Sequence, residues 1–344
     1  MQWHRYQMID KNPIIVEVTR GTMVESRHRI HGIVCDASGK VIHGWGDLDM
    51  SIYPRSAIKP MQAVPLIETG AADAVSASEA EIAFACASHN GEHHHVNMSN
   101  TWLKRISLSH QDLECIGHIS IETATSYAQL RSNEVITNAH NNCSGKHSGF
   151  LATAQHMGEP LTGYIAKDHP VQQRMEQILS ELGGCDLSNT GTGIDGCGIP
   201  VMAMPLSALA LATARMAAPD GLEAGRAQAC KRITSAMMAY PFNVAGQNRF
   251  DTDIMTAGKG EFATKTGAEG VHVGILVNRG YGVAIKCEDG TKRAADVAMG
   301  NIINMLGGLD EAGQGAVAHH LRTPISNAAG AHAGEIRMCA DWQG

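Results

Sequence analysis

The sequence predicts an α+β fold in which one antiparallel sheet collects strands from both ends of the chain around a helical middle. Strand-like runs rich in Ile, Val and Thr open the chain, and similar runs return near its end. Helix start and stop signals fill the stretch between them. Separate blocks of strands and helices are typical of α+β architecture. We expect a single unit over residues 1–344, with a helical region at about 56–250 between strand regions at 14–50 and 262–290.

The first strand region is expected to be an antiparallel meander. Runs at 14–19 and 23–30 are separated by the turn signal Arg20-Gly21. A hairpin should join 33–35 to 41–45 through the loop that ends at Gly39. In the second strand region, runs at 271–277 and 281–287 lie on either side of an Asn-Arg-Gly turn. These runs are predicted to pair with those from the start of the chain.

The helical middle is divided by clear local signals. A helix should begin within 53–60 and run to about residue 70, with a kink or a break at Pro65. A capping box formed by Ser78 and Glu81 starts the next helix. Three adjacent histidines at 93–95 are interpreted as a helix start at the edge of a site. Further helices are expected up to 103 and 157, at 170–182, after 205, and at 221–240 and 293–305, with a short strand at 134–137 and a surface tail at 327–334.

Composition excludes several classes of protein. The formal net charge of −7 argues against a nucleic-acid or anionic-membrane partner, either of which would require clustered Lys and Arg. The most apolar stretch, 201–218, is interrupted by polar residues and is typical of a buried helix. The N-terminal residues contain no apolar signal segment. Nine scattered cysteines indicate a reduced compartment, so we expect a cytoplasmic protein.

Three short motifs point to serine chemistry. They are Ser56-x-x-Lys59, then Ser88-His89-Asn90, then a Lys-Thr-Gly run that begins at Lys265. In this order S-x-x-K, S-D-N and K-T-G are typical of serine β-lactamases and penicillin-binding proteins, and His89 stands where that signature has Asp. A serine needs a base to take its proton, and a buried lysine close to a second ammonium group is disfavoured in its charged form. The motifs therefore predict a serine acyl-transfer site.

Longer runs around these motifs resemble the rhizobial-type, class 3 L-asparaginases of the asparaginase II family. The runs are residues 55–60, 86–92, 141–147, 193–198 and 265–270, within a resemblance that extends from about 16 to 306. It implies a fold like that of serine β-lactamases, penicillin-binding proteins and glutaminases. It also implies a homodimer that hydrolyses the small molecule L-asparagine to L-aspartate and ammonia. The implied catalytic tandems are Ser56 with Lys59, and Ser88 with Lys265.

The roles within these tandems follow from their positions in the chain. Ser56 has its lysine one helical turn away and opens a helix, where free N–H groups favour a developing oxyanion. Backbone N–H groups at this helix start and after Gly267 could form the oxyanion hole. We therefore expect Ser56 to be the nucleophile and Lys59 its base. Ser88 and Lys265 are expected to return a proton to the leaving ammonia.

The resemblance further implies one zinc ion per chain, held by Cys143, Lys146 and Cys197. Spacing alone would favour two buried cysteines and a helix-capping lysine, because lysine is a rare zinc ligand. We also expect Arg55, Asp195 and His147 to contact the substrate. Asp195 could hold the substrate ammonium group, and Arg55 a carboxylate or the structure of the site.

Three alternative functions remain open from the sequence. A glutaminase differs by one methylene of substrate, which a pocket discriminates by only about 1–3 kcal/mol. A β-lactamase-like serine hydrolase would use the same motifs, although such enzymes act outside the cytoplasm. A non-catalytic zinc-binding protein with a degenerate site is the third alternative.

Overall fold

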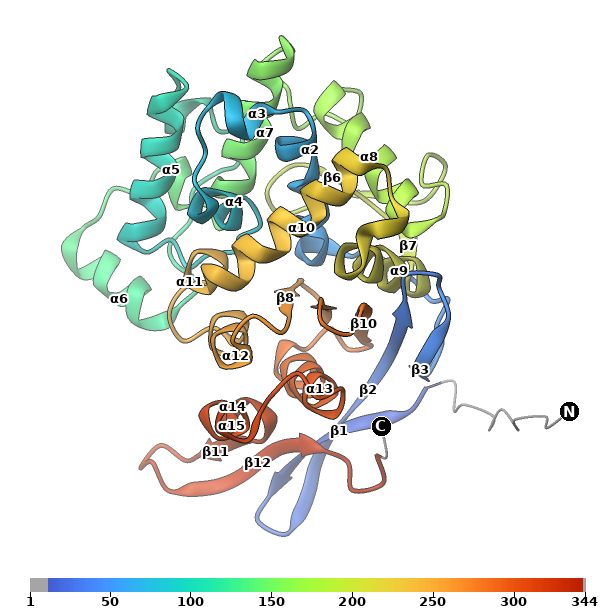
Figure 1. The fold of residues 1–344 in the computed structure, drawn as a ribbon. Coiled ribbons are helices and arrows are strands. Elements are labelled where there is room, and N and C mark those ends of the chain that lie inside the picture. Colours follow the sequence, from blue (N-terminus) through green and yellow to red (C-terminus); the bar gives the residue numbers. More distant parts are fainter. Residues whose placement is uncertain (1–11, 343–344) are drawn as a thin grey trace, which may run out of the picture.

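One large antiparallel sheet organises the molecule. A computed structural model describes residues 12–342 of the chain (Figure 1). Within these residues eight strands form the sheet in the order β11-β12-β1-β2-β10-β9-β8, and β3 pairs with β2 beside this path. The strands are β1 (Ile14–Arg20), β2 (Met23–Asp36), β3 (Val41–Trp45), β8 (Ala263–Thr266), β9 (Val271–Leu276), β10 (Tyr281–Cys287), β11 (Thr323–Ser326) and β12 (His332–Met338). The predicted α+β class, with strands from both ends of the chain, is confirmed.

The central strand β2 is longer than the sequence suggested. It is one continuous strand of 14 residues instead of separate runs at 23–30 and 33–35. Its first half pairs with β1, and its second half pairs with β10 on one side and with β3 on the other. Because β10 joins β2 directly, the two predicted strand regions meet at the middle of the sheet.

Helices fill the chain between the two groups of strands. They are α1 (Lys59–Gln62), α2 (Val64–Glu68), α3 (Ala71–Ala74), α4 (Glu79–Ala85), α5 (His93–Arg105), α6 (Thr123–Ser132), α7 (Ser144–Met157), α8 (Pro170–Gly183), α9 (Leu206–Ala217), α10 (Ala224–Ala239), α11 (Pro241–Val244) and α12 (Phe250–Gly258). Short 3-10 turns are η1 (Arg55–Ile58), η2 (His110–Asp112), η3 (Asn138–His140) and η4 (Pro219–Gly221). Two small ladders join β4 (Ser51–Ile52) to β7 (Met204–Pro205) and β5 (Thr192–Ile194) to β6 (Pro200–Met202).

Local signals in this region had mixed success. The predicted capping box is confirmed, since the Ser78 side chain accepts from the N–H of Glu81. The helix expected up to residue 70 is divided into η1, α1 and α2, and a proline lies in the first turn of each of these two α-helices. The short strand expected at 134–137 is wrong, because this stretch is irregular and the Val135 side chain is largely exposed.

Two helices cover opposite faces of the sheet. Gly282 of β10 faces α9, because a Cβ there would lie 2.1 Å from the Ala214 nitrogen. The next residue, Val283, points the other way, beside Gly274 of β9, which faces Met299. Met299 belongs to α13 (Lys292–Met305), which is followed by α14 (Glu311–Ala316) and α15 (Ala318–Leu321). The sheet core is therefore enclosed between α9 and α13 (Figure 1).

The C-terminal hairpin is the main element that the sequence did not predict. Residues 327–334, expected to be a surface tail, instead form the exposed turn between β11 and β12 and the start of β12. Strand β12 then pairs with β1 in the register Val16 to Met338. None of the helices within residues 12–342 is long and apolar enough to cross a membrane.

Candidate active site

The segment before Ser56 is held in a strained backbone conformation. Arg55 has φ 51°, in the left-handed region that residues with side chains rarely adopt. Ser56 follows within η1, and Lys59 begins α1 one turn later. Gly267, just after β8, packs closely against this turn, since a Cβ there would lie 3.0 Å from the carbonyl oxygen of Pro54. The S-x-x-K and K-T-G motifs are therefore neighbours in the fold.

His89 joins the Ser88 turn to the start of α7. Its backbone N–H donates to the carbonyl oxygen of Asn142, and its Nε2 lies 2.9 Å from Ser144 Oγ. The N–H of Gly91 donates to its Nδ1, so the ring proton is on Nε2 and is donated to Ser144. Burial lowers the pKa of His89 well below its ordinary value, which keeps the ring neutral. His89 thus has a structural role where the β-lactamase signature has Asp.

Lys59 is the centre of the polar cluster. Its side chain is fully buried, and its Nζ donates to Ser88 Oγ at 2.9 Å and to Cys143 Sγ at 3.1 Å. It also donates to the carbonyl oxygen of Ala87. In contrast, the Ser56 hydroxyl makes no hydrogen bond with any residue between 12 and 342. The structure thus brings Lys59 into contact with Ser88, whereas the Ser56–Lys59 pairing stays a prediction.

Lys265 lies in the same buried region, with a carboxylate behind it. Its Nζ donates to the carbonyl oxygen of Thr266 at 2.6 Å and lies 3.9 Å from Asp251 Oδ2. Burial lowers the pKa of Lys265 to about 7, although the Asp251 carboxylate favours the ammonium form and Lys59 opposes it. A hydrogen bond between Lys265 and Ser88 is not among the contacts of residues 12–342, so this tandem also stays a prediction.

Asp251 is a residue that the sequence motifs did not reveal. Although burial alone would raise the pKa of its carboxyl group, a hydrogen bond from His272 and the Lys265 ammonium hold it well below its usual range. Its Oδ1 accepts from His272 Nε2 and from Thr264 Oγ1, each at 3.0 Å. Its Oδ2 accepts from the N–H of Thr266 at 3.0 Å. No local pattern around Asp251 marks it, because these partners come from β8 and β9.

The proposed metal ligands lie together beside Lys59. Lys146 Nζ is 3.0 Å from Cys197 Sγ, and the Cys143 Sγ accepts from Lys59 Nζ and donates to Asn142 Oδ1, each at 3.1 Å. The neighbouring Cys143 side chain and the Lys146 ammonium lower the pKa of Cys197 to about 5 against the effect of burial. A buried thiolate, a second sulfur and an amine nitrogen match the N/S donor set that zinc prefers. The three residues therefore fit a zinc ion, provided that Lys146 and Cys143 lose their protons on binding.

Two of the three expected substrate-binding residues contact each other. Arg55 Nε donates to Asp195 Oδ1 at 2.8 Å, which links the Ser56 turn to the glycine-rich loop. Burial opposes ionisation of Asp195, but Lys146 and Arg55 lower its pKa overall. His147 lies deeper, with Nδ1 2.8 Å from the Tyr164 hydroxyl and a buried Nε2 that has no partner. Arg55 and Asp195 are thus adjacent to Ser56, whereas His147 belongs to the interior of α7.

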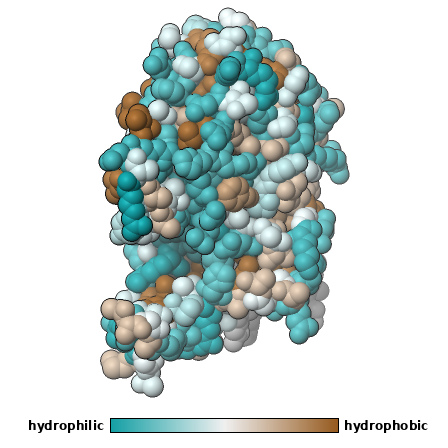
Figure 2. Space-filling model, turned by 90° about the vertical axis from the view of Figure 1, so that its left-hand side faces the viewer, coloured by the Kyte–Doolittle hydropathy of each residue, from teal (hydrophilic) through white to brown (hydrophobic). Residues whose placement is uncertain are grey.

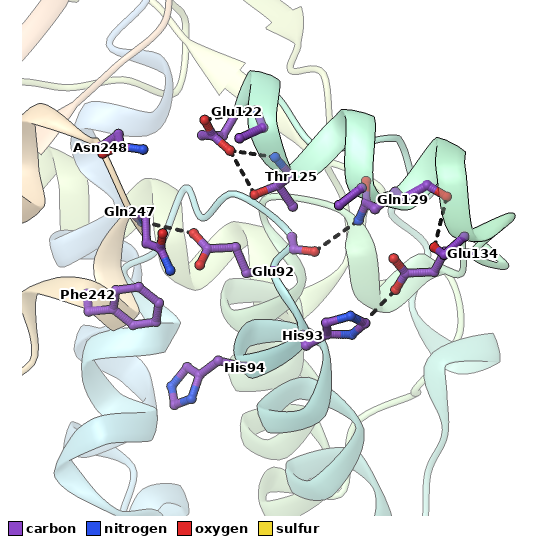
Figure 3. A pocket seen from close by; sticks show the side chains of 14 residues that line it. Glu92, His93, His94, Glu122, Thr125, Gln129, Glu134, Phe242, Gln247 and Asn248 are labelled. Carbon is purple, nitrogen blue, oxygen red and sulfur yellow. Dashed lines mark hydrogen bonds and ion pairs between the residues drawn. The ribbon is translucent and has the colours of Figure 1, made fainter.

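A cavity of about 580 Å³ lies next to the Ser88 turn (Figure 3). Glu92 and Gln247 line it. The Glu92 carboxylate and the backbone carbonyl oxygen of Gln247 both accept from the side-chain amide of Asn90. Arg249 in turn donates to Asn90 Oδ1 at 2.7 Å and to the Ser88 carbonyl oxygen at 3.2 Å. Because no serine or lysine of the three motifs lines this cavity, it is adjacent to the polar cluster and distinct from it.

Comparisons with known proteins gave one family and several distant structural similarities. The sequence matched no curated protein. Among solved structures, Mglu in its native form at 4.3 M NaCl is 15% identical, with a TM-score of 0.46, over 81% of this chain and 61% of that chain. A β-lactamase from Mycobacterium bovis is 11% identical, with a TM-score of 0.39, over 81% of this chain and 95% of that chain. The profile of the L-asparaginase II family matches residues 16–338, so the chain belongs to this family.

Proposed function

We propose that this chain is an L-asparagine amidohydrolase that releases L-aspartate and ammonia through a serine acyl-enzyme. Membership of the L-asparaginase II family indicates an asparaginase-type hydrolase. The observation that carries the serine mechanism is the contact between the buried Lys59 amine and the Ser88 hydroxyl at 2.9 Å, close to the Ser56 turn. An amine next to hydroxyl groups in a dry site can move a proton to and from them.

Ser56 is proposed to attack the side-chain amide carbon of the substrate. It is partly accessible, whereas the Ser88 side chain is buried, so substrate can reach Ser56 more readily. As an ammonium group, Lys59 donates one hydrogen bond to each of its three acceptors on Ala87, Ser88 and Cys143. As an amine, it has a lone pair that can accept the proton of the Ser56 hydroxyl. The attack forms a bond between Ser56 Oγ and the amide carbon, and the C–N bond breaks as the nitrogen accepts a proton through Ser88 and Lys265. Water then hydrolyses the β-aspartyl ester and restores the Ser56 hydroxyl.

The oxyanion that forms in this step needs hydrogen-bond donors. We expected the N–H groups at the Ser56 helix start and after Gly267 to supply them. The N–H of Gly267 is already used, since it donates to the Val271 carbonyl oxygen at 2.7 Å. The N–H of Ala57 in η1 is also used, since it donates to the Pro54 carbonyl oxygen at 3.2 Å. We therefore propose the Ser56 N–H and the N–H groups after Gly267 as the donors to the oxyanion.

The pair formed by Arg55 and Asp195 suits an amino-acid substrate. An α-amino acid carries one ammonium and one carboxylate group, and the two side chains offer the opposite charges side by side, 2.8 Å apart. We propose that substrate inserts between them, with Asp195 taking the ammonium group and Arg55 the carboxylate. We propose His147 as a third substrate-site residue only because it is next to Lys146 in α7.

We propose that one zinc ion per chain is held by Cys143, Lys146 and Cys197. When bound, zinc supplies a positive centre that can orient a substrate oxygen. Elemental analysis of protein purified without chelators should give about one zinc per chain, lost in Cys143→Ala and Cys197→Ala. The buried Cys230 of α10 provides a matched control, because Cys230→Ala should keep the ion. Zinc-free protein from a chelator-free preparation would contradict this site.

The decisive experiment follows the acyl group. Rapid quenching with L-asparagine and peptide mapping should place a β-aspartyl adduct on the peptide that contains Ser56, and Ser56→Ala should abolish the adduct and lower kcat by several orders of magnitude. An adduct on Ser88 would reverse the roles of the two serines. Parallel assays with L-glutamine and nitrocefin separate glutaminase and β-lactamase activity, and no turnover of any substrate would favour a non-catalytic zinc-binding protein.

We further propose that the protein is a cytoplasmic homodimer. Its surface offers an apolar segment for self-association, and hydrophobic side chains interrupt the mainly hydrophilic face that carries α5 and α6 (Figure 2). Exposed apolar residues gather between 116 and 135, namely Ile116, Ile119, Ile121, Tyr127, Leu130 and Val135. Light scattering should give a dimer mass that falls to the monomer in Ile116→Asp with Ile121→Asp. Met23→Asp, at the exposed first residue of β2, should leave the dimer intact.

A further inference from the structure

A cluster of two histidines and one aspartate lies where α12 meets α15. Asp253 is on α12, and His319 and His320 are consecutive on α15. His320 Nε2 lies 2.8 Å and His319 Nε2 lies 3.8 Å from the same carboxylate oxygen, Asp253 Oδ2. One ligand atom from each residue lies within 4.8 Å of the other two. We propose that these residues form a second metal site, for Zn²⁺ or a similar divalent transition-metal ion.

The spacing of the ligand atoms is close to that of a tetrahedral site. Bond lengths of about 2.0–2.2 Å place neighbouring ligand atoms roughly 3.3 Å apart in a tetrahedron. The observed separations of 2.8 and 3.8 Å lie on either side of this value. Small rotations of the side chains are enough to bring both nitrogens to one ion. Two imidazoles with a carboxylate suit zinc, cobalt or nickel, whereas calcium and magnesium prefer oxygen ligands.

An ordinary ion pair explains only part of this arrangement. The contact between Asp253 and His320 would be complete with one histidine, yet the His319 ring also lies against His320, with ring centroids 4.0 Å apart. Burial and the neighbouring His320 lower the pKa of His319, although Asp253 opposes this effect. A shared cation accounts for the convergence of both rings on one oxygen.

The cluster is both fixed and accessible. The inner ring, His320, packs edge-on against Phe250, with ring centroids 5.3 Å apart. The His320 side chain is 16% exposed, compared with 55% for His319 and 33% for Asp253. An ion can thus enter from solvent, and water can complete its coordination. Within residues 12–342 Asp253 has no side-chain partner besides these two histidines, so an ion displaces nothing else.

Another cluster of metal-binding residue types makes a useful contrast. His28, Cys287 and Asp289 also lie within reach of one another. However, Asp289 already accepts from His28 Nδ1 through one oxygen, and from the Cys287 thiol and the Thr291 N–H through the other. An ion there would have to break all three contacts. At the site on α12 and α15, an ion would displace only the proton of the hydrogen bond between His320 and Asp253.

Binding at this site would connect two parts of the chain that are distant in sequence. Helix α12 begins next to Asp251, and α15 leads into the β11–β12 hairpin. An ion held by both helices would resist their separation, so it should raise the melting temperature of the protein. The proposal does not depend on the catalytic function, because none of its three residues belongs to the serine and lysine cluster.

Co²⁺ and Zn²⁺ titrations of the full-length protein test the site. Cobalt bound by the cysteines gives an intense ultraviolet charge-transfer band, whereas a histidine and aspartate site gives only visible bands. We expect one equivalent of Co²⁺ to add visible absorption without the ultraviolet band. Binding of this equivalent should persist in Cys143→Ala. It should weaken at least tenfold in His319→Gln, an exposed change with little risk to folding, and be lost in His320→Gln with Asp253→Asn.

The adjacent histidines at the start of α5 give a matched control. His94 Nε2 bonds to Asn243, whereas His93 points toward Glu134, so these two rings diverge. His93→Gln with His94→Gln should leave Co²⁺ and Zn²⁺ binding and the metal-dependent rise in melting temperature unchanged. The proposal is overturned if equilibrium dialysis against micromolar Zn²⁺ finds no equivalent besides the one removed by Cys143→Ala. It is also overturned if His319→Gln binds as tightly as the wild type.

Discussion

Replacing Asp251 with Asn should move the alkaline limb of the pH–activity profile to lower pH. Lys265 must be an ammonium group to donate a proton to the leaving nitrogen through Ser88, so activity is present below the pKa of Lys265 and is lost as the pH rises through it. That pKa is lowered to about 7 by burial, while the negative charge of Asp251 raises it. Removing the charge leaves burial unopposed, and the pKa of Lys265 falls further.

The size of the effect follows from the geometry. At 3.9 Å between Lys265 Nζ and Asp251 Oδ2, two unit charges attract by about 4 kcal/mol at an effective dielectric constant of about 20. Since one pH unit corresponds to about 1.4 kcal/mol, the limb could move by up to about three pH units. Local relaxation around the new amide reduces this value, so we expect a displacement of at least about one pH unit.

The assay is ammonia release from L-asparagine between pH 4.5 and 9, analysed as kcat/KM, which reports groups in the free enzyme. Asp296→Asn is the matched control, because Asp296 lies 3.8 Å from His272 on the side away from Asp251. It removes the same charge at a greater distance from Lys265 and should move the limb much less. An alkaline limb that stays in place or moves upward in folded Asp251→Asn would refute the assigned role of Lys265 and its partner.

Three further results are expected. L-Asparagine should be hydrolysed at least about tenfold better than L-glutamine in kcat/KM, a difference of about 1.4 kcal/mol, and equal rates would contradict the assignment. Removing zinc with a chelator should raise KM for L-asparagine more than it lowers kcat, whereas the opposite pattern would place the ion in the chemical step. Gly282→Ala should destabilise the protein by about 1–3 kcal/mol and lower Tm by several degrees, because the new Cβ would lie 2.1 Å from the Ala214 nitrogen. Gly315→Ala, with no atom within 4 Å, should leave Tm nearly unchanged in the same calorimetric scan.

The sheet was predictable where local signals and burial agree. β-Branched runs next to Gly turns identified β1, β2, β3, β9 and β10, because each carries its own hydrophobic pattern. The β11–β12 hairpin has no such pattern, since its turn is rich in Ala and Gly and its stability comes from pairing with β1. The false strand at 134–137 had β-like residues but no neighbouring strand, and its Glu134 instead contacts His140.

In the candidate site, as in the sheet, short local motifs could be read from the sequence, whereas contacts made only by the fold could not. Motifs with short spacing identified Ser56, Lys59 and Lys265 because each lies in a recognisable run. Asp251 and His272 were missed because they approach Lys265 only through the pairing of β8 with β9, in which Thr266 lies opposite His272. No sequence pattern specifies that register in advance. The hydrogen bond from Lys59 to Ser88 likewise depends on tertiary packing, in which α1 and α4 both contact α10.

The pairing of β1 with β12 has a consequence for how the protein is made. Val16 lies opposite Met338, so β1 needs a partner that is synthesised more than 300 residues after it. Until then β1 and β2 expose unpaired backbone edges, and such edges are prone to association with other chains. Contacts between residues so distant in sequence also slow folding. The nascent chain should therefore depend on chaperones until its last strands emerge, and truncation before β12 should give aggregated protein.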